Sequence, residues 1–304
     1  MRPAWSIIFF TSSSGLGLGL AAWIVLGFLG PLAGTDVIGV GLFTLVLIGA
    51  GLISSTLHLG HPERAWRALS QWRSSWLSRE GVLAVVMLAG LVGWLAHLYF
   101  IGQPPLWATL AVVVLAVATV YATSMIYASL KTVARWHHPL TPVTYLMFAA
   151  AGGLVAITWL LAILGTPADA ALAQATMVLL ASAWGVKIVW WRIAGAEGSG
   201  STLASATGLG SFGDVRTLMP PHTSENYLQH EMGFKVARRH ASKLRFISLL
   251  LGAMVPLFLI ATDPASVVLV GIALLSHMIG IFTERWLFFA EAKHVVSLYY
   301  GETH

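Results

Sequence analysis

Ionisable side chains that could carry proton chemistry gather between residues 54 and 81. The run reads SSTLHLGHPERAWRALSQWRSSWLSREG and holds two histidines, four arginines and two glutamates, directly after an almost uncharged apolar stretch. His58 can hydrogen-bond a quinone carbonyl or accept a quinol hydroxyl proton near its unperturbed pKa of roughly 6.5. Glu80 can pass that proton to water. Together with Arg64 and Arg67, these residues predict a pocket for proton-coupled quinone chemistry at a membrane surface.

Simpler interpretations of the same residues stay open. A histidine beside arginines at a membrane surface is often a lipid headgroup contact. Glu80 could only cap a helix, or it could pair with Arg73 or Arg79. The residue types alone do not decide between these roles and a quinone pocket.

The composition identifies the elements that must position these residues. The chain has 304 residues, of which 57% are hydrophobic and only 10% charged, with a mean hydropathy of +0.80; a soluble domain has about a quarter charged residues. Apolar segments of spanning length must be helical in lipid. We predict an all-α bundle of eight transmembrane helices forming a single integral membrane domain over 1–304, with a long connection at 194–242. The expected segments are 6–30, 36–60, 81–101, 106–131, 141–165, 170–193, 243–262 and 264–290.

The basic residues indicate how the helices are oriented. All 17 Lys and Arg residues fall at the N-terminus, in the second, fourth and sixth connections, at the C-terminus or on the adjoining helix ends. The positive-inside rule then places both termini and these connections in the cytoplasm. The same rule explains the basic pI of 9.7 without nucleic acid as a partner. Lys187 and Arg192 are interpreted as snorkelling anchors of the sixth segment.

Local patterns refine this picture. The run from 63 to 76 is predicted to be an amphipathic helix lying in the interface, with tryptophans along one side and arginines along the other. Gly51, Ser54 and His58 share one helical face that a neighbouring helix or a flat ligand could approach. The glycines of TSSSGLGLGL near the start indicate helix packing and not a dinucleotide motif. Glu284 and Arg285 are either a structural ion pair or part of a proton path.

The chain has no cysteine, which excludes a cysteine-ligated iron–sulfur cluster within it. A b-haem would need two histidines on facing helices, and a His58–His277 pair is conceivable. Otherwise His277 is a core residue or contributes to the quinone pocket. A secondary transporter would more typically show broken helices with paired charges at the midplane. Here the ionisable residues collect at one membrane face, which argues against transport.

The opening run also resembles the signature of a known family. An apolar helix ends in LHLG and is followed by a proline, an RA pair and a serine-rich LS–E entry to the next helix. This arrangement is similar to the DmsC family, the membrane anchor subunits of dimethyl sulfoxide reductase-type molybdoenzymes. The closing ERWLFFAEAKHVVSLYYG and the connection PPHTSENYLQHEMGFKVARRHASKLR resemble the sulfite dehydrogenase branch.

The resemblance implies a complex in the bacterial inner membrane. A molybdopterin catalytic subunit and an iron–sulfur subunit would exchange electrons with ubiquinone or menaquinone in this anchor, which itself carries no molybdenum. His58 and Glu80 match family residues tied to quinol binding, and the family generally lacks haem. The charge bias favours a cytoplasmic sulfite-oxidising complex. A menaquinol-oxidising anchor of a dimethyl sulfoxide reductase-like complex remains the alternative, as does a b-haem anchor.

Overall fold

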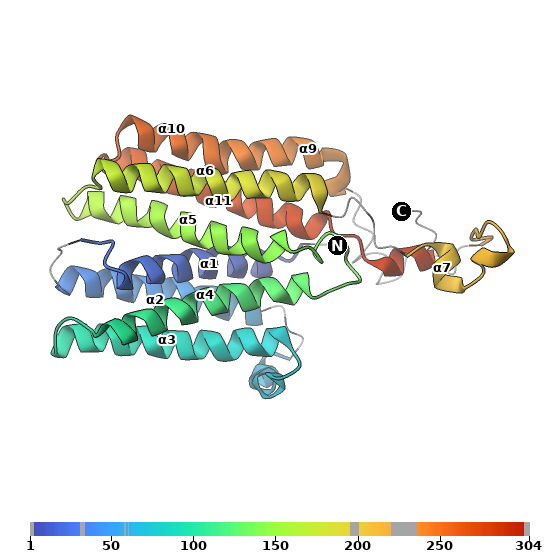
Figure 1. Cartoon of the computed structure of the whole chain (residues 1–304), viewed down its shortest axis with the longest axis horizontal. Coiled ribbons are helices and arrows are strands. Elements are labelled where there is room, and N and C mark those ends of the chain that lie inside the picture. The colour runs from blue at the N-terminus through green and yellow to red at the C-terminus, as the bar shows by residue number, and fades with distance from the viewer. Residues whose placement is uncertain are drawn as a thin grey trace.

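The computed structural model describes residues 3–30, 34–57, 59, 61–194, 201–219 and 236–300. Over these ranges the chain is helical and contains no strand. The long helices lie side by side in one elongated bundle (Figure 1). His58, the central residue of the predicted pocket, lies outside the described residues.

Within the described ranges, eight helical rods are long and apolar enough to cross a membrane, as the sequence predicted. The seventh rod joins two helices through a π-helical turn, η3, and the third begins at Trp76, five residues earlier than expected. The rods are α1 (Trp5–Val25), α2 (Gly34–Thr56), α3 (Trp76–Phe100), α4 (Leu106–Ala128), α5 (Leu140–Ile163), α6 (Ala170–Ile193), α9 (Val236–Leu249) with η3 (Leu250–Met254) and α10 (Val255–Thr262), and α11 (Val267–Ala290).

The two ends of the bundle differ in charge. One end, here called the basic end, carries the beginning of α1 and the second, fourth and sixth connections, and it lies at the right of Figure 1. A short helix of the sixth connection, α7 (Leu203–Thr207), extends beyond the bundle at this end. The opposite end carries short turns without Lys or Arg in the described residues.

Helix α1 lies inside the bundle because its small residues let other helices approach. Gly19 of α1 faces Ala149 and Gly153 of α5 so closely that a Cβ at Gly19 would overlap the Ala149 carbonyl. Gly51 of α2 packs in the same way against Ser13 and Ser14 of α1. The interpretation of the glycine-rich start as a helix-packing surface is therefore confirmed.

The π-helical turn η3 shapes the contact between the last two rods. A π turn leaves carbonyls without their usual helical partners, and two of these accept hydrogen bonds from α11. The Ser276 hydroxyl donates to the Leu251 carbonyl, and His277 Nδ1 lies 2.7 Å from the Gly252 carbonyl. Gly280 is needed here because a Cβ at this position would overlap the backbone of Gly252.

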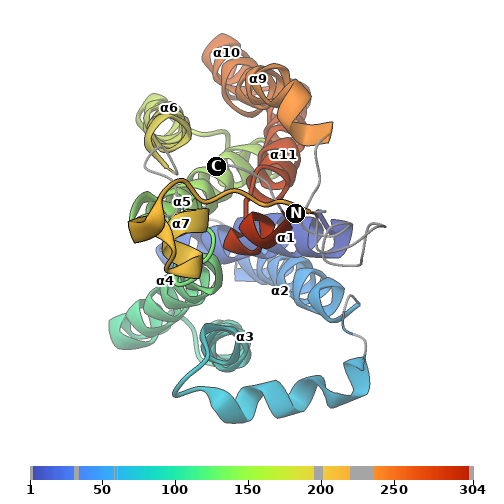
Figure 2. The ribbon, with the colours of Figure 1, turned by 90° about the vertical axis from the view of Figure 1, so that its right-hand side faces the viewer.

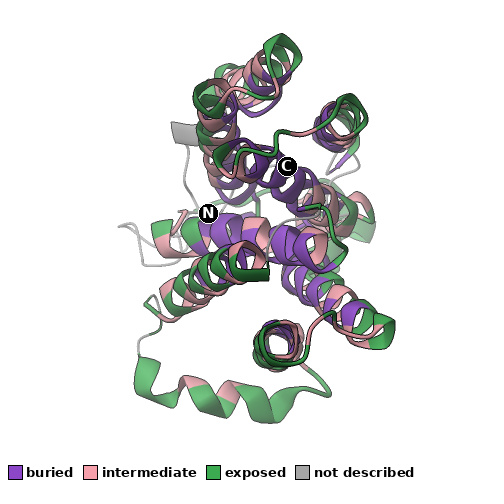
Figure 3. Cartoon of the chain, turned by 90° about the vertical axis from the view of Figure 1, so that its left-hand side faces the viewer, coloured by how far each residue is buried: buried purple, intermediate pink, exposed green. Residues whose placement is uncertain are grey.

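The second connection contains a 3₁₀ helix, η1 (Pro62–Gln71), which crosses the basic end from α2 to α3 (Figure 2). It rests on α3, where the Ser78 hydroxyl donates to the Ala68 carbonyl. Trp66 and Trp72 stay exposed. Figure 3 shows this exposed segment beside helices whose buried residues face the bundle interior. The predicted interfacial helix over 63–76 is thus helical, but it is a 3₁₀ helix that ends at Gln71.

Candidate functional site

Glu80 lies in the bundle interior and not at the surface. Ser75 caps α3 by accepting a hydrogen bond from the Ser78 amide, so Glu80 is not needed as the cap. Its side chain faces α4, where the Thr123 hydroxyl donates to Oε1, and the residue is only 4% exposed. Arg79 bonds the carbonyls of Trp72 and Arg73 instead of pairing with Glu80. A buried carboxylate held by one hydroxyl is costly in a membrane protein and usually marks a functional position.

The other charges of the opening run lie elsewhere. Arg64 is 58% exposed in its side chain, with Nε 3.6 Å from Glu63 Oε1. His61 Nδ1 lies 3.1 Å from the same carboxylate oxygen. These contacts are local to η1. The structure therefore does not bring Arg64 and Glu80 together through any described contact.

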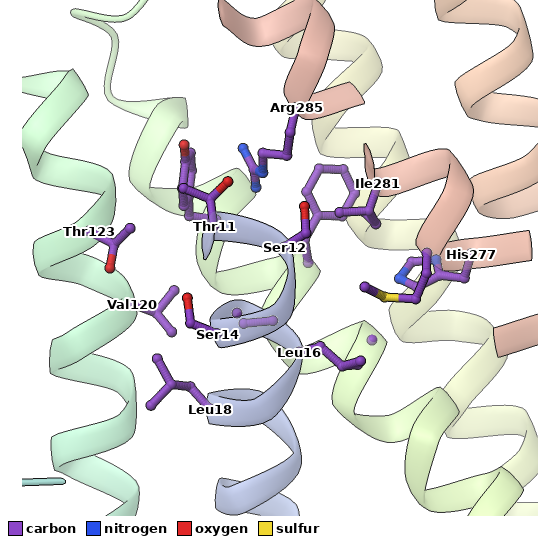
Figure 4. A pocket seen from close by; sticks show the side chains of 16 residues that line it. Thr11, Ser12, Ser14, Leu16, Leu18, Val120, Thr123, His277, Ile281 and Arg285 are labelled. Atoms are coloured by element: carbon purple, nitrogen blue, oxygen red, sulfur yellow. The ribbon is translucent and has the colours of Figure 1, made fainter. Parts of the chain in front are cut away.

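A small polar cavity lies beside the Glu80–Thr123 pair. Its volume is about 20 Å³, and Thr123 forms part of its wall. A cavity of about 10–15 Å³ already holds one water molecule if two to four polar groups surround it. Figure 4 shows side chains from α1, α4 and α11 around this cavity. Its polar lining consists of Thr11, Ser12, Ser14, Thr123, Tyr145, His277 and Arg285.

His277 of α11 borders this cavity and is fully buried. The Gly252 carbonyl can only accept a hydrogen bond, so the nearby Nδ1 must carry the proton. In the neutral ring, Nε2 is then an acceptor, and it lies on the side of Gly152, another lining residue. The structure thus places His277 and the partner of Glu80 on the same cavity.

A buried ionic cluster adjoins the cavity through Arg285. Lys187 of α6 lies with Nζ 2.5 Å from Glu284 Oε1, and both side chains are 0% exposed. Arg285 Nε lies 3.5 Å from the other Glu284 oxygen. The interpretation of Lys187 as a snorkelling anchor is wrong, because its ammonium group pairs inside the bundle. The cluster of Lys187, Glu284 and Arg285 holds two cations and one carboxylate.

A second ionic cluster ties the basic end together. Glu291 lies 3.3 Å from Arg135 and 2.6 Å from Arg245, which joins the fourth connection to α9 and to the end of α11. Burial lowers the pKa of Arg135, whereas the Glu291 carboxylate opposes that shift. Because its partners are in place and it is partly exposed, we interpret this cluster as structural.

Comparison with known proteins identifies the family. The model of the family described as "DMSO reductase anchor subunit (DmsC)" matches residues 1–301. The chain belongs to the DmsC family. The C subunit of sulfite dehydrogenase from Allochromatium vinosum is 32% identical over 99% of this chain and 99% of its own length. The C polypeptide of anaerobic dimethyl sulfoxide reductase from Escherichia coli is 32% identical over 36% of this chain and 39% of its own.

The fold is consistent with the family's description as an anchor subunit, because the described residues include eight helices long and apolar enough to span a membrane. The described residues contain no group of three or more His, Asp or Glu side chains able to hold a metal ion. The sequence pointed to Glu80 and His277, but it missed Thr123, Tyr145 and the pairing of Lys187. The signal for Lys187 was present: a lysine in an apolar segment lay six residues before the segment's end, which is deep for a snorkelling side chain.

Proposed function

We propose that this DmsC-family protein is the quinone-reactive anchor subunit of a molybdenum–iron–sulfur oxidoreductase. A molybdopterin catalytic subunit and an iron–sulfur subunit are its proposed partners. The anchor exchanges two electrons and two protons between the iron–sulfur partner and membrane quinone. The sulfite-oxidising branch is favoured because the relative aligned over nearly both full lengths is a sulfite dehydrogenase subunit.

The observation that carries the proposal is the buried Glu80–Thr123 pair beside a polar cavity. Thr123 both holds the carboxylate and lines the cavity, and His277 lines it from another helix. Quinone chemistry moves protons together with electrons, so a site needs groups that exchange protons away from bulk water. Glu80 and His277 are such groups within the described bundle.

The shape of the surrounding space fits a quinone with a long apolar tail. An apolar pocket of about 220 Å³ lies between α1, α4 and α5. It shares Leu18, Val120 and Ala149 with the polar cavity. The polar cavity holds about one water and not a ring, so the ring is proposed to sit at its edge, near Glu80. The tail then follows the apolar wall.

Each residue near the proposed quinone site has a separate proposed role. Bound quinone supplies the two-electron chemistry. Glu80 takes up or releases a proton at its carboxylate, and His58 is proposed to hydrogen-bond the quinone carbonyl. His277 offers Nε2 as a further hydrogen-bond acceptor at the cavity. Arg64, exposed on η1, is proposed to meet the polar ring as it enters from the basic end.

The proposal also includes which end of the bundle faces the cytoplasm. The Lys and Arg distribution supports a cytoplasmic basic end with both termini inside a bacterial inner membrane. The iron–sulfur partner would dock at this end, because electron transfer needs it close to the Glu80 side of the bundle. Electrons then run from sulfite through the partners to quinone.

The experiment is co-expression of the anchor with its two neighbouring subunits, followed by assay of sulfite-dependent quinone reduction in membranes. Glu80→Gln should abolish most quinone reduction while the complex still reduces an artificial acceptor that takes electrons from the iron–sulfur partner. Glu63→Gln, an exposed carboxylate on η1, is the matched control. Full quinone turnover in Glu80→Gln would refute the proposed role of Glu80.

A second function follows from the shorter matches to anaerobic dimethyl sulfoxide reductases. In that case the same site would oxidise menaquinol and deliver its electrons to the iron–sulfur partner. The same membranes distinguish the two: quinol-dependent dimethyl sulfoxide reduction without sulfite oxidation would favour this alternative.

A further inference from the structure

The cavity and the buried ionic cluster are continuous. Arg285 belongs to both, since its guanidinium lines the cavity and its Nε lies 3.5 Å from Glu284 Oε2. On the other side, Thr123 belongs both to the cavity and to the Glu80 hydrogen bond. The cavity is therefore lined by Thr123, which bonds Glu80 of α3, and by Arg285, which pairs with Glu284 of α11.

Groups without partners point into this space. Ser12 Oγ and Arg285 Nη1 are buried and have no hydrogen-bond partner among the described residues. Both residues line the cavity, and Figure 4 shows them with Thr123 and His277 around it. Buried polar groups left without a partner are rare, and an ordered water is the usual explanation.

Tyr145 of α5 forms part of the cavity wall and contacts Arg285. Its ring also supports Arg285, whose guanidinium carbon lies 3.7 Å from the ring centroid. A hydroxyl in this position can donate and accept, as passing on a proton requires.

The ionic cluster also reaches toward the basic end. Lys187 Nζ lies 3.5 Å from the centroid of the Trp190 ring, and the Arg135 guanidinium carbon lies 5.6 Å from the same ring. Arg135 is 21% exposed in its side chain. The buried Lys187–Glu284 pair is thus separated from the partly exposed Arg135 by the ring of Trp190.

We propose that the cavity holds ordered water which, with Tyr145, connects Glu80 to the Lys187–Glu284 pair as an internal proton relay. The inference rests on the proposed quinone function and adds the route by which the proton leaves or reaches Glu80. A proton leaves the Glu80 carboxyl, an O–H bond forms on water or Tyr145, and a second proton passes from that group to the Glu284 carboxylate. No electron moves in this step, and quinone reduction uses the same route in reverse.

A purely structural ion cluster would have a different signature. Such a cluster would hold α6 against α11. Its loss would lower the yield of folded protein and leave the solvent deuterium isotope effect on turnover unchanged. A relay instead makes proton transfer slower when a member is removed, while quinone binding stays intact. The test must therefore separate binding, assembly and proton transfer.

Two variants of the full complex carry the test. Tyr145→Phe removes one hydroxyl at constant ring size, and Glu284→Gln keeps the shape of the side chain but removes its proton-accepting charge. We expect each to lower quinone-linked turnover by about tenfold or more and to raise the solvent deuterium isotope effect. Affinity for a fluorescent quinol-like inhibitor should stay within about twofold of the unaltered complex.

Two matched controls accompany them. Tyr127→Phe removes the hydroxyl of a neighbouring tyrosine that does not line the cavity. Glu63→Gln removes an exposed carboxylate on η1, away from the cavity and both ion clusters. Neither should change the isotope effect.

Each outcome has a distinct meaning. Normal turnover in Tyr145→Phe, which has little reason to misfold, overturns the relay even if Glu284→Gln fails to assemble. Loss of inhibitor binding in both variants would also overturn it, since these residues would then bind the ring. Absence of quinone-linked turnover in the unaltered complex would instead refute the proposed function itself, and the relay with it.

Discussion

The charges of the η1 segment and those of the bundle interior behave in opposite ways. On η1, Arg64 and Glu63 are exposed and pair locally at 3.6 Å. In the interior, Lys187 and Glu284 come from helices nearly 100 residues apart in sequence and pair at 2.5 Å with no exposure. Charged residues that lie close together in the sequence are therefore found at the membrane surface. The buried charges, which are costly to desolvate, are widely spaced in the sequence and are paired only when the helices pack together.

The largest effect should come from removing a buried charge. Glu284→Met leaves the two buried cations, Lys187 and Arg285, without their carboxylate, and an uncompensated buried charge costs about 3–5 kcal/mol. We expect strongly reduced folded protein, measured by fluorescence-detected size exclusion after mild heating. Arg67→Met on η1 is the control. Equal thermal stability of the two variants would contradict the claim that the interior charges contribute more to stability than the surface charges do.

Glu80→Gln should have the next largest effect, and on activity more than on folding. Removing a proton-exchanging group typically lowers the rate by about 100-fold or more, whereas the amide keeps a hydrogen bond to Thr123. We expect quinone-linked turnover to fall by that order with an unchanged unfolding temperature. A variant that unfolds readily but turns over normally when folded would assign Glu80 a structural role.

Helix packing gives a smaller effect. Gly280→Ala places a methyl group against the backbone of Gly252, and overpacking of this kind costs about 1–3 kcal/mol. The unfolding temperature should fall, and the His277–Gly252 contact should loosen. Gly185→Ala, where an added Cβ meets nothing within 4 Å, is the matched control. A similar loss at both positions would contradict the close contact of α11 with η3.

Arg64→Gln tests the surface side of the comparison. An exposed ion pair contributes about 0–1 kcal/mol, so stability should hardly change. If Arg64 meets the entering ring, KM for quinone should rise by about two- to threefold, with kcat unchanged. An unchanged KM at low salt would remove Arg64 from the proposed site.

The smallest effect concerns the segment after α11. Burial lowers the pKa of His294 below its ordinary value of 6.5, and Nδ1 accepts a hydrogen bond from the Val296 amide. The unfolded chain therefore binds more protons than the folded one as pH falls through about 6.5. Folded stability should decrease slightly from pH 7.5 to pH 5.5, and His294→Gln should reduce that dependence. Thermal unfolding across this pH range measures it.

The sequence by itself determined the membrane bundle. Eight apolar runs of about 20 residues can only become helices in lipid. Their bounds lie within five residues of the observed ones, except that α9 begins at Val236, seven residues before the predicted start of the seventh segment. The third helix begins earlier than hydropathy indicated, because Arg79 and Glu80 look like loop residues. Ser75 nevertheless caps the helix before them. The glycine pattern of α1 also predicted close packing, since only small residues allow it.

Only the tertiary structure decided which polar groups meet. Thr123, Tyr145 and Lys187 look unremarkable along the chain, and their partners are 43 to about 140 residues away. Helix periodicity fixes which residues share a face, but it does not fix which faces of eight helices turn toward one another. That choice depends on packing at Gly19, Gly252 and Gly280 and on pairing of buried charges. Both are properties of the assembled bundle.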